Sequence, residues 1–331
     1  MGHLTPISKD DDARWMGAAI SLSQRGRGRT APNPCVGAMV VRDGSVIGRG
    51  WTRPHGRPHA EAVALEQAGD AARGATLYTS LEPCAHVSPR GPTCTASIIE
   101  AGIARVVIGL RDPDPRTDGQ GIAMLEAAGI AVSTGIGANE ARRAMQGFLS
   151  RQHLGRAHVT LKLATSLDGR IARSDGESRW ITGEAARAHG HVERARHDAI
   201  LVGRGTLDAD TPRLNVRLQG FEDRAPMRLL LTRGTATAGW TAVASPEVAA
   251  AHPGVDHLMV EGGAGAASAF LNADLVDRLL LYRAPILIGE GRAALGDIGL
   301  ASLADAHGRW RRVDTRMLGS DTLEVYERVR D

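Results

Sequence analysis

The chain has 331 residues, with 40 basic and 37 acidic side chains, a formal net charge of +3 and three cysteines. This length suggests two domains, and 43% hydrophobic with 23% charged residues is typical of a globular protein, which excludes a disordered chain or a disulfide scaffold. The sequence contains no run of about 18 apolar residues, so no transmembrane helix is predicted. Residues 1–15 are polar and do not predict a secretory signal. We therefore expect a cytoplasmic protein without a membrane partner.

The predicted elements of the first half alternate between helices and strands. A helix is expected first, and a hairpin with its turn at Asp43-Gly44 follows it. Three further helices alternate with three strands after the hairpin. This order predicts an α/β domain over residues 1–150. The expected helices are 13–24, 59–68, 95–101 and 119–128, and the expected strands are 35–41, 45–51, 75–80, 104–110 and 130–134.

The second half is also predicted to be α/β. The polar segment 150–157 is expected to be a linker, and a second domain over 157–331 is expected to follow it. No internal repeat relates the two halves. The expected strands are 158–164, 199–203, 228–232, 256–260, 277–284 and 323–328, and the expected helices are 184–196 and 265–272.

One His and two Cys in the first half have the character of a catalytic zinc site. His59 precedes a predicted helix, Cys84 follows a predicted strand, and Cys94 comes ten residues later. Three protein ligands leave the fourth position for water, whose pKa zinc lowers toward ~7 to generate hydroxide. Glu61, two residues after His59, is suited to shuttle the proton, as in the H-x-E…P-C-x-x-C signature. The alternatives are a packed His with two core thiols, or a structural zinc with Cys35 as fourth ligand.

Four segments of the first half resemble the pyrimidine deaminase of riboflavin biosynthesis, a zinc enzyme with a cytidine deaminase-like fold. They are APNPCVGAMVV (31–41), PHAE (58–61), TSLEPCAH (79–86) and GPTC (91–94). The resemblance implies hydrolytic removal of the 2-amino group of 2,5-diamino-6-ribosylamino-4(3H)-pyrimidinone 5′-phosphate. It also implies zinc binding by His59, Cys84 and Cys94, with Glu61 as proton shuttle.

The same resemblance implies substrate contacts. Asn33 matches the residue that holds the pyrimidine, His86 a substrate-contacting His, and Arg90 a basic residue for the 5′-phosphate. Two positions depart from the family pattern: Cys35 stands where many members have Asn, and Thr52 stands where His is common.

The second half lacks a strand–GxGxxG–helix fingerprint, but residues 260–268 are glycine-rich between a predicted strand and a predicted helix. Glycines there can let the backbone approach a phosphate at the helix N-terminus, although a simple tight turn explains them equally well. Lys162 is one of only two lysines among the 40 basic residues, the other being Lys9. It lies in a strand-like run, where it is either an active-site cation or a strand lysine with its charge in solvent.

Further segments resemble the reductase module of the same pathway, which has a dihydrofolate reductase-like fold and uses NADPH. They are LKLATSLDGRIA (161–172), ESRWITG (177–183), RARHDAILVGRGTLDADTPRLNVR (194–217) and VEGGAGAASAF (260–270). The resemblance places Lys162 beside the reacting ribose. It implies substrate contacts at Ser178, Arg194, Leu214, Arg217 and Glu261, with the two arginines suited to the 5′-phosphate. It implies NADPH contacts at Thr165, Trp180, Thr206, Asp210, Gly263, Ala264, Gly265, Ala266, Ala267, Ser268 and Ala269. Arg233 is a candidate for the 2′-phosphate.

The order of the two modules is that of the bifunctional deaminase/reductases of riboflavin biosynthesis. We therefore expect two consecutive reactions that yield 5-amino-6-(5-phosphoribitylamino)uracil, and by family analogy a homodimer or homotetramer. One alternative is a monofunctional deaminase with a reductase-like domain that only binds or stabilises. The other is a nucleic-acid-binding protein or RNA base deaminase. However, the clusters of basic residues along the chain are short, and aromatic residues make up only 3% of the chain, so no nucleic-acid partner is expected.

Overall fold

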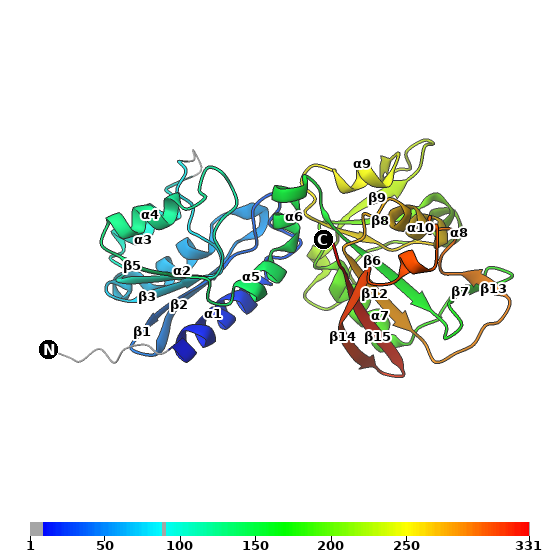
Figure 1. The fold of residues 1–331 in the computed structure, drawn as a ribbon, viewed down its shortest axis with the longest axis horizontal. Coiled ribbons are helices and arrows are strands. Elements are labelled where there is room, and N and C mark those ends of the chain that lie inside the picture. The colour runs from blue at the N-terminus through cyan, green and yellow to red at the C-terminus, as the bar shows by residue number, and fades with distance from the viewer. Residues whose placement is uncertain (1–8, 88–90, 331) are drawn as a thin grey trace. The chain divides into compact units, whose positions relative to one another are not determined.

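The computed structural model describes residues 9–87 and 91–330, which divide into two compact units between Leu154 and Gly155 (Figure 1). Helix α6 (Gln146–Leu154) occupies most of the segment that we expected to be a linker. Its residues Phe148 and Leu149 are buried in the core of the first unit, and this packing extends the helix through the polar sequence that follows. The irregular connection is therefore shorter than expected.

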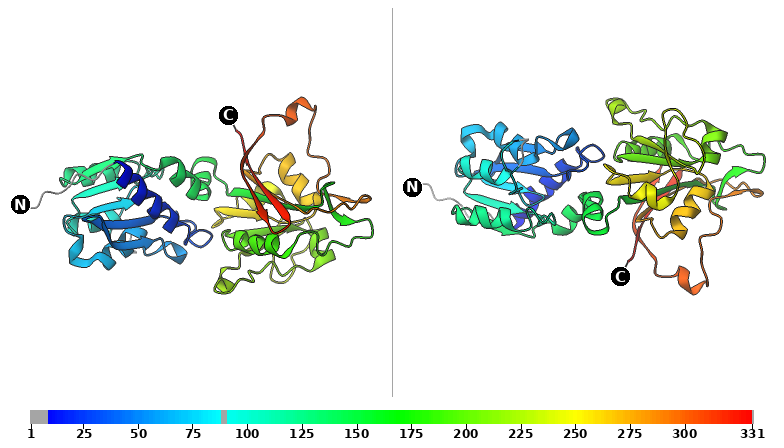
Figure 2. Two further views of the ribbon diagram at one scale, coloured as in Figure 1. Left: turned by 90° about the horizontal axis from the view of Figure 1, so that it is seen from below. Right: turned by 90° about the horizontal axis from the view of Figure 1, so that it is seen from above.

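The first unit is built on a five-stranded sheet in the order β2-β1-β3-β4-β5. Strand β1 pairs antiparallel with β2 and with β3, whereas β3, β4 and β5 are parallel. Helices cover both faces of the sheet (Figures 1 and 2). The strands are β1 (Gly37–Arg42), β2 (Ser45–Trp51), β3 (Thr76–Thr79), β4 (Arg105–Ile108) and β5 (Ala131–Thr134), and the helices are α1 (Lys9–Ser23), α2 (Ala60–Ala68), α3 (Cys94–Glu100), α4 (Gln120–Ala127), α5 (Ala138–Ala144) and α6.

Glycines bring α2 unusually close to strand β2. A Cβ added to Gly48 or Gly50 would lie 2.1 Å from the carbonyl oxygen of Ala64 or Ala60, respectively. No other residue type fits at these two positions without separating the helix from the sheet. The close contact fixes the start of α2, where His59 directly precedes the helix and Glu61 lies in its first turn.

The second unit contains an eight-stranded sheet in the order β10-β9-β8-β11-β6-β12-β15-β14. The pairs from β10 to β12 are parallel, and the last two strands are antiparallel. A small sheet of β7 and β13 lies beside it. The strands are β6 (His158–Thr165), β7 (Arg170–Arg173), β8 (Ala199–Gly203), β9 (Met227–Leu231), β10 (Thr241–Val243), β11 (His257–Val260), β12 (Arg278–Arg283), β13 (Gly291–Ala293), β14 (Trp310–Leu318) and β15 (Asp321–Arg328), and the helices are α7 (Glu184–Arg194), α8 (Arg204–Asp210), α9 (Pro246–Ala250) and α10 (Ala264–Asn272).

Every helix and strand expected from the sequence has a counterpart, and the α/β class of both halves is as expected. The elements that we did not predict are short or exposed, because weak apolar patterns carry little signal. Strand β14 is an example: it is the edge strand of the large sheet, and none of its side chains is fully buried. Within residues 9–87 and 91–330, no helix combines the length and apolar character that crossing a bilayer requires.

Candidate active sites

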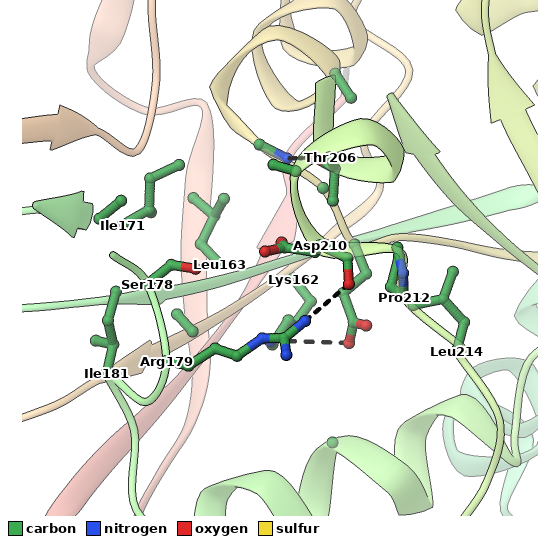
Figure 3. Close-up of a pocket in the computed structure, with 18 of the residues that line it drawn as sticks. Lys162, Leu163, Ile171, Ser178, Arg179, Ile181, Thr206, Asp210, Pro212 and Leu214 are labelled. Carbon is green, nitrogen blue, oxygen red and sulfur yellow. Dashed lines mark hydrogen bonds and ion pairs between the residues drawn. The ribbon is translucent and has the colours of Figure 1, made fainter. Parts of the chain in front are cut away.

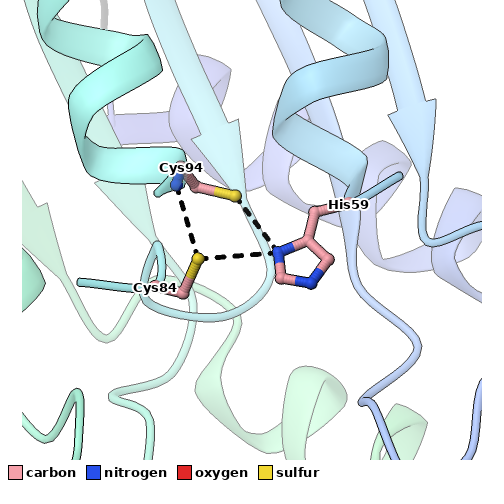
Figure 4. A group of neighbouring side chains, drawn as sticks. All are labelled: His59, Cys84 and Cys94. Carbon is pink, nitrogen blue, oxygen red and sulfur yellow. Dashed lines mark hydrogen bonds between the residues drawn. The ribbon is translucent and has the colours of Figure 1, made fainter. Parts of the chain in front are cut away.

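His59, Cys84 and Cys94 come together in the first unit (Figure 4). His59 is the residue before α2, and Cys94 is the first residue of α3. The Nδ1 atom of His59 lies 3.3 Å from Cys94 Sγ and 3.6 Å from Cys84 Sγ. All three possible ligand atoms lie within 4.8 Å of one another. This donor set and its closeness fit zinc with one open position.

Cys35 is not part of this cluster. Its buried thiol donates to the carbonyl oxygen of Ala144 at 3.4 Å. Among the described residues, only Cys84 and Cys94 lie close enough to His59 to share a metal ion with it. This arrangement therefore does not support a structural zinc with Cys35 as the fourth ligand.

The electrostatics of the two thiols suit metal binding. A hydrogen bond from the Cys94 thiol lowers the pKa of Cys84 to about 4, with His59 adding to the effect against the opposing cost of burial. The pKa of Cys94 is raised, first because its proton is shared with Cys84 and then because it is buried. The first proton is thus lost from Cys84, which presents a thiolate at neutral pH. Thiolates are the form of Cys that binds zinc.

Glu61 lies in the first turn of α2, beside the cluster. Its side chain is buried, and burial raises the pKa of its carboxyl group. The charges of His59 and Cys84 are close enough to act on that pKa. A carboxyl group that can exchange a proton near the open zinc position is what a deaminase requires.

The remaining predicted residues of the first unit lie in different surroundings. The Asn33 amide nitrogen lies 3.2 Å from His59 Nε2 and donates to the Gly56 carbonyl oxygen at 3.0 Å. His86 Nδ1 lies 3.4 Å from Thr117 Oγ1. Thr52 is buried, and its hydroxyl accepts the Val36 N–H at 3.0 Å, so it has a structural role. Arg90 lies outside the described residues.

The sequence analysis missed Glu82, which organises the chain around Cys84. Its buried carboxylate accepts backbone N–H groups from Asp112 at 3.2 Å, Gly119 at 3.1 Å and Ile122 at 3.2 Å. These bonds attach the loop after β4 and the start of α4 to the turn that carries Cys84. The available signal in the sequence was an acidic residue two positions before the predicted ligand Cys84, in the LEPC segment.

The second unit contains a cavity of about 930 Å³ (Figure 3). It lies at the carboxyl ends of the parallel strands, where α/β proteins bind their ligands. Most of the residues that the family resemblance singled out line it. These are Lys162, Ser178, Trp180, Arg194, Thr206, Asp210, Leu214, Arg217, Glu261, Gly263, Ala264, Gly265 and Ala266.

Five of the predicted cofactor contacts do not line this cavity. Helix α10 begins at Ala264, so only its first turn faces the cavity, and Ala267, Ser268 and Ala269 lie beyond it. The Ser268 hydroxyl instead accepts the N–H of Gly296 at 2.8 Å. Thr165 is buried at the end of β6, and Arg233 is exposed beyond the end of β9.

Lys162, Glu261 and Arg194 form a charged cluster inside the cavity. The Lys162 ammonium lies 3.8 Å from Glu261 Oε1. The Arg194 guanidinium pairs with both oxygens of the same carboxylate, with an Nε–Oε2 distance of 3.1 Å, and donates to the Asn215 carbonyl oxygen at 3.3 Å. Burial alone would raise the pKa of Glu261, but the charges of Lys162 and Arg194 outweigh it and lower that pKa.

Two residues beside this cluster were not predicted. His191 is buried, and its Nε2 accepts from Arg217 Nε at 3.3 Å. Burial, followed by the charges of Arg194 and Arg217, lowers the pKa of His191, so the imidazole is neutral near pH 7. The ring of Tyr282 lies 5.7 Å from the Lys162 ammonium. Neither residue stands in a pattern that the sequence alone could distinguish from core packing.

The glycine-rich turn before α10 is hydrogen-bonded to α8, the helix that follows β8. The Gly263 N–H donates to Thr206 Oγ1 at 2.8 Å, which joins the start of α10 to α8. A Cβ on Gly263 would lie 3.2 Å from that hydroxyl. The turn, the helix N-terminus and a cavity of this size fit a dinucleotide with its pyrophosphate at α10.

Together, the folds and sites define a zinc deaminase joined to a nucleotide-dependent reductase. Comparisons with known proteins agree with this class. Residues 9–110 match the family model of the cytidine and deoxycytidylate deaminase zinc-binding region, and residues 157–323 match that of the RibD C-terminal domain. Zinc and NADPH are the cofactors that these two domains imply.

Full-length relatives and solved structures identify the family. The chain is 36% identical to the riboflavin biosynthesis protein RibD of Aquifex aeolicus, covering 97% of this chain and 99% of that one, and 39% identical to RibD of Mycobacterium tuberculosis, covering 97% and 98%. A RibD structure from Acinetobacter baumannii matches with a TM-score of 0.86 at 34% identity over 98% of this chain and 100% of that one. The deaminase/reductase structure from Thermotoga maritima matches with a TM-score of 0.88 at 32% identity over 97% and 99%. The chain belongs to the RibD family of bifunctional deaminase/reductases of riboflavin biosynthesis.

Proposed function

We propose that the two units catalyse consecutive steps on one phosphorylated pyrimidine. The first unit replaces the 2-amino group of 2,5-diamino-6-ribosylamino-4(3H)-pyrimidinone 5′-phosphate with oxygen from water and releases ammonia. The second unit reduces the ribosyl side chain to ribityl, giving 5-amino-6-(5-phosphoribitylamino)uracil. The observation that carries this proposal is the His59–Cys84–Cys94 cluster beside the buried Glu61.

In the first unit, His59, Cys84 and Cys94 would hold zinc, which when bound activates the attacking water. The Glu61 carboxylate takes a proton from that water and passes it to the leaving amine, which regenerates the carboxylate. Asn33, in contact with His59, is placed to hold the pyrimidine beside the metal, with His86 as a further contact.

In the second unit, NADPH would supply hydride to C1′ of the sugar. Lys162 supplies the proton that completes the reduction, and Glu261 orients its ammonium at 3.8 Å. Ser178 and Leu214 line the cavity as substrate contacts, and Arg217 is exposed at its margin, where it can meet the 5′-phosphate. Arg194 has part of its guanidinium committed to Glu261, so we assign it to positioning that carboxylate.

A coupled assay with the zinc-loaded full chain tests the proposal, following ammonia release and NADPH loss separately. Glu61→Ala is expected to abolish ammonia release but to leave NADPH oxidation intact when the deaminated substrate is supplied. Lys162→Ala is expected to do the reverse. Ammonia release without any NADPH oxidation would show instead a monofunctional deaminase with a reductase-like domain.

We further propose that the protein works in the cytoplasm as a homodimer or homotetramer and has no nucleic-acid partner. The exposed edge strand β14 supports self-association, since an open sheet edge can pair with another chain. Sedimentation analysis gives the oligomeric state. Salt-dependent binding of an RNA oligonucleotide would contradict the last part of the proposal.

A further inference from the structure

The cavity of the second unit is lined by more cationic than anionic side chains. One of these cations, Arg204, differs from the others in its position relative to the sheet. Among the cavity-lining residues, Arg204 is the cation that directly follows a strand of the large sheet, at the end of β8. The others lie on β6, on β13, on or just before α7, or in the segment after α8. They are Lys162, Arg179, Arg187, Arg194, Arg213, Arg217 and Arg292.

The order of the strands indicates which part of a dinucleotide would reach Arg204. The Lys162–Glu261 pair marks the reacting end, at β6 and β11. The glycine-rich turn, which suits the pyrophosphate, follows β11, and β8 is the next strand on the other side. Neighbouring strands lie about 4.8 Å apart, so an adenosine ribose that continues in the same direction lies above the end of β8.

Arg204 is held in place but keeps donors for a ligand. Its Nη1 donates to Thr237 Oγ1 at 3.1 Å, and its Nη2 donates to the Thr235 carbonyl oxygen at 2.8 Å. These two bonds use two of the five N–H groups of a guanidinium. The carboxylate of Asp208 lies 3.8 Å away, but its side chain is 62% exposed and competes weakly in solvent.

The alternative cation at this side, Arg233, is less well placed. Leu231, at the end of β9, lines the cavity, whereas Arg233 is exposed two residues later and does not. We propose that Arg204 binds the 2′-phosphate of NADPH and thereby sets a preference for NADPH over NADH, which has a hydroxyl group at that position. The inference rests on the proposed reductase function.

Binding to the full-length zinc-loaded protein tests the inference apart from turnover. The probes are 2′,5′-ADP and 5′-AMP, titrated by calorimetry, with the NADPH and NADH values of kcat/KM as a second readout. Arg204→Gln is expected to weaken 2′,5′-ADP and NADPH about 10- to 100-fold, the range of a charged hydrogen bond, while 5′-AMP and NADH change less than about twofold. Arg204→Lys keeps the charge without the fork and is expected to retain an intermediate preference.

Arg311→Gln is the matched control, because Arg311 is an exposed arginine on β14 that pairs with Glu327 at 3.2 Å, far along the sheet order from β8. It is expected to keep the wild-type preference. An unchanged preference in Arg204→Gln, an equal loss for both nucleotides, or a loss of preference in Arg233→Gln would overturn the inference. If Arg204→Gln does not fold, a wild-type preference in Arg204→Lys overturns it. Wild-type protein that binds neither NADPH nor 2′,5′-ADP would overturn the proposed reductase function itself.

Discussion

Arg194 pairs with both carboxylate oxygens of Glu261, and this one contact holds the charge cluster of the reductase cavity together. The side chains of Arg194 and Glu261 are only 17% and 10% exposed, so the pair is shielded from solvent. Removing one partner of such a pair leaves an uncompensated charge.

We therefore expect Arg194→Met to lose most reductase activity and about 3 kcal/mol of unfolding free energy. The pKa of Glu261 should rise, because the effect of burial is then opposed only by Lys162 and, to a smaller extent, by His191. The measurements are calorimetric unfolding and the pH dependence of NADPH oxidation. Deaminase activity of the same protein is the internal control, and a wild-type pH profile would contradict the positioning role.

Gly56 makes room for Asn33 in the deaminase site. Its φ is +81°, and a Cβ there would lie 2.6 Å from Asn33 Cγ. Gly56→Ala is expected to displace Asn33 and raise the deaminase KM about tenfold, with NADPH oxidation of the deaminated substrate unchanged. Steady-state kinetics of both reactions give the result.

Gly44→Ala is the control for the previous variant. Gly44 also has a positive φ, +72°, in the β1–β2 hairpin, but an added Cβ would meet nothing within 4 Å. Both variants carry the backbone strain of about 1 kcal/mol, and only Gly56→Ala carries the clash. Equal effects of the two variants on the deaminase KM would show that Asn33 is not the reason.

Loss of the metal should separate the two activities. Cys84→Ser replaces the ligand that most readily forms a thiolate, so zinc content and ammonia release are both expected to fall. Reductase activity with the deaminated substrate should remain, because the charged cluster of the second unit is independent of these ligands. Elemental analysis and the two assays measure this. Cys35→Ser, which changes a thiol outside the cluster, should keep its zinc.

Asp277 should make the second unit sensitive to acid. Arg156 donates to its two oxygens at 2.7 and 2.9 Å, and Val159 N–H donates at 2.9 Å. Burial would raise the pKa of Asp277, but these hydrogen bonds outweigh it and lower that pKa. A lowered pKa in the folded state contributes stability that is present above the unfolded pKa of about 3.9 and is lost as the pH falls through the folded value.

Asp277→Asn should therefore cost about 2 kcal/mol of unfolding free energy at pH 6, and the difference from wild type should shrink toward pH 2. Calorimetry of the full chain across this range tests it. The control is Asp175→Asn, because Asp175 forms an exposed pair with Arg173 at 3.4 Å and should show little difference at any pH. A constant difference between wild type and Asp277→Asn would mean that packing, and not charge, explains the loss.

The sequence by itself determined the two α/β domains and pointed to the three side chains of the His59–Cys84–Cys94 cluster. Most of the residues that it singled out in the second unit also line the cavity there. Short motifs such as PHAE and LEPC predict the site residues because the chemistry requires those side chains. Periodic apolar runs predict the strands and helices because the buried face of each element must be apolar. The length of α6 could not be predicted, since packing of Phe148 and Leu149 decides it.

The tertiary structure alone decided which charges meet. Glu261 and Arg194 are 67 residues apart along the chain, and Glu82 contacts N–H groups up to 40 residues away. It also placed Arg204, and not Arg233, on the wall of the cavity, and it gave Thr52 a backbone partner at Val36. Such pairings follow from strand order and close packing, which depend on the whole chain, and a local pattern contains no record of them.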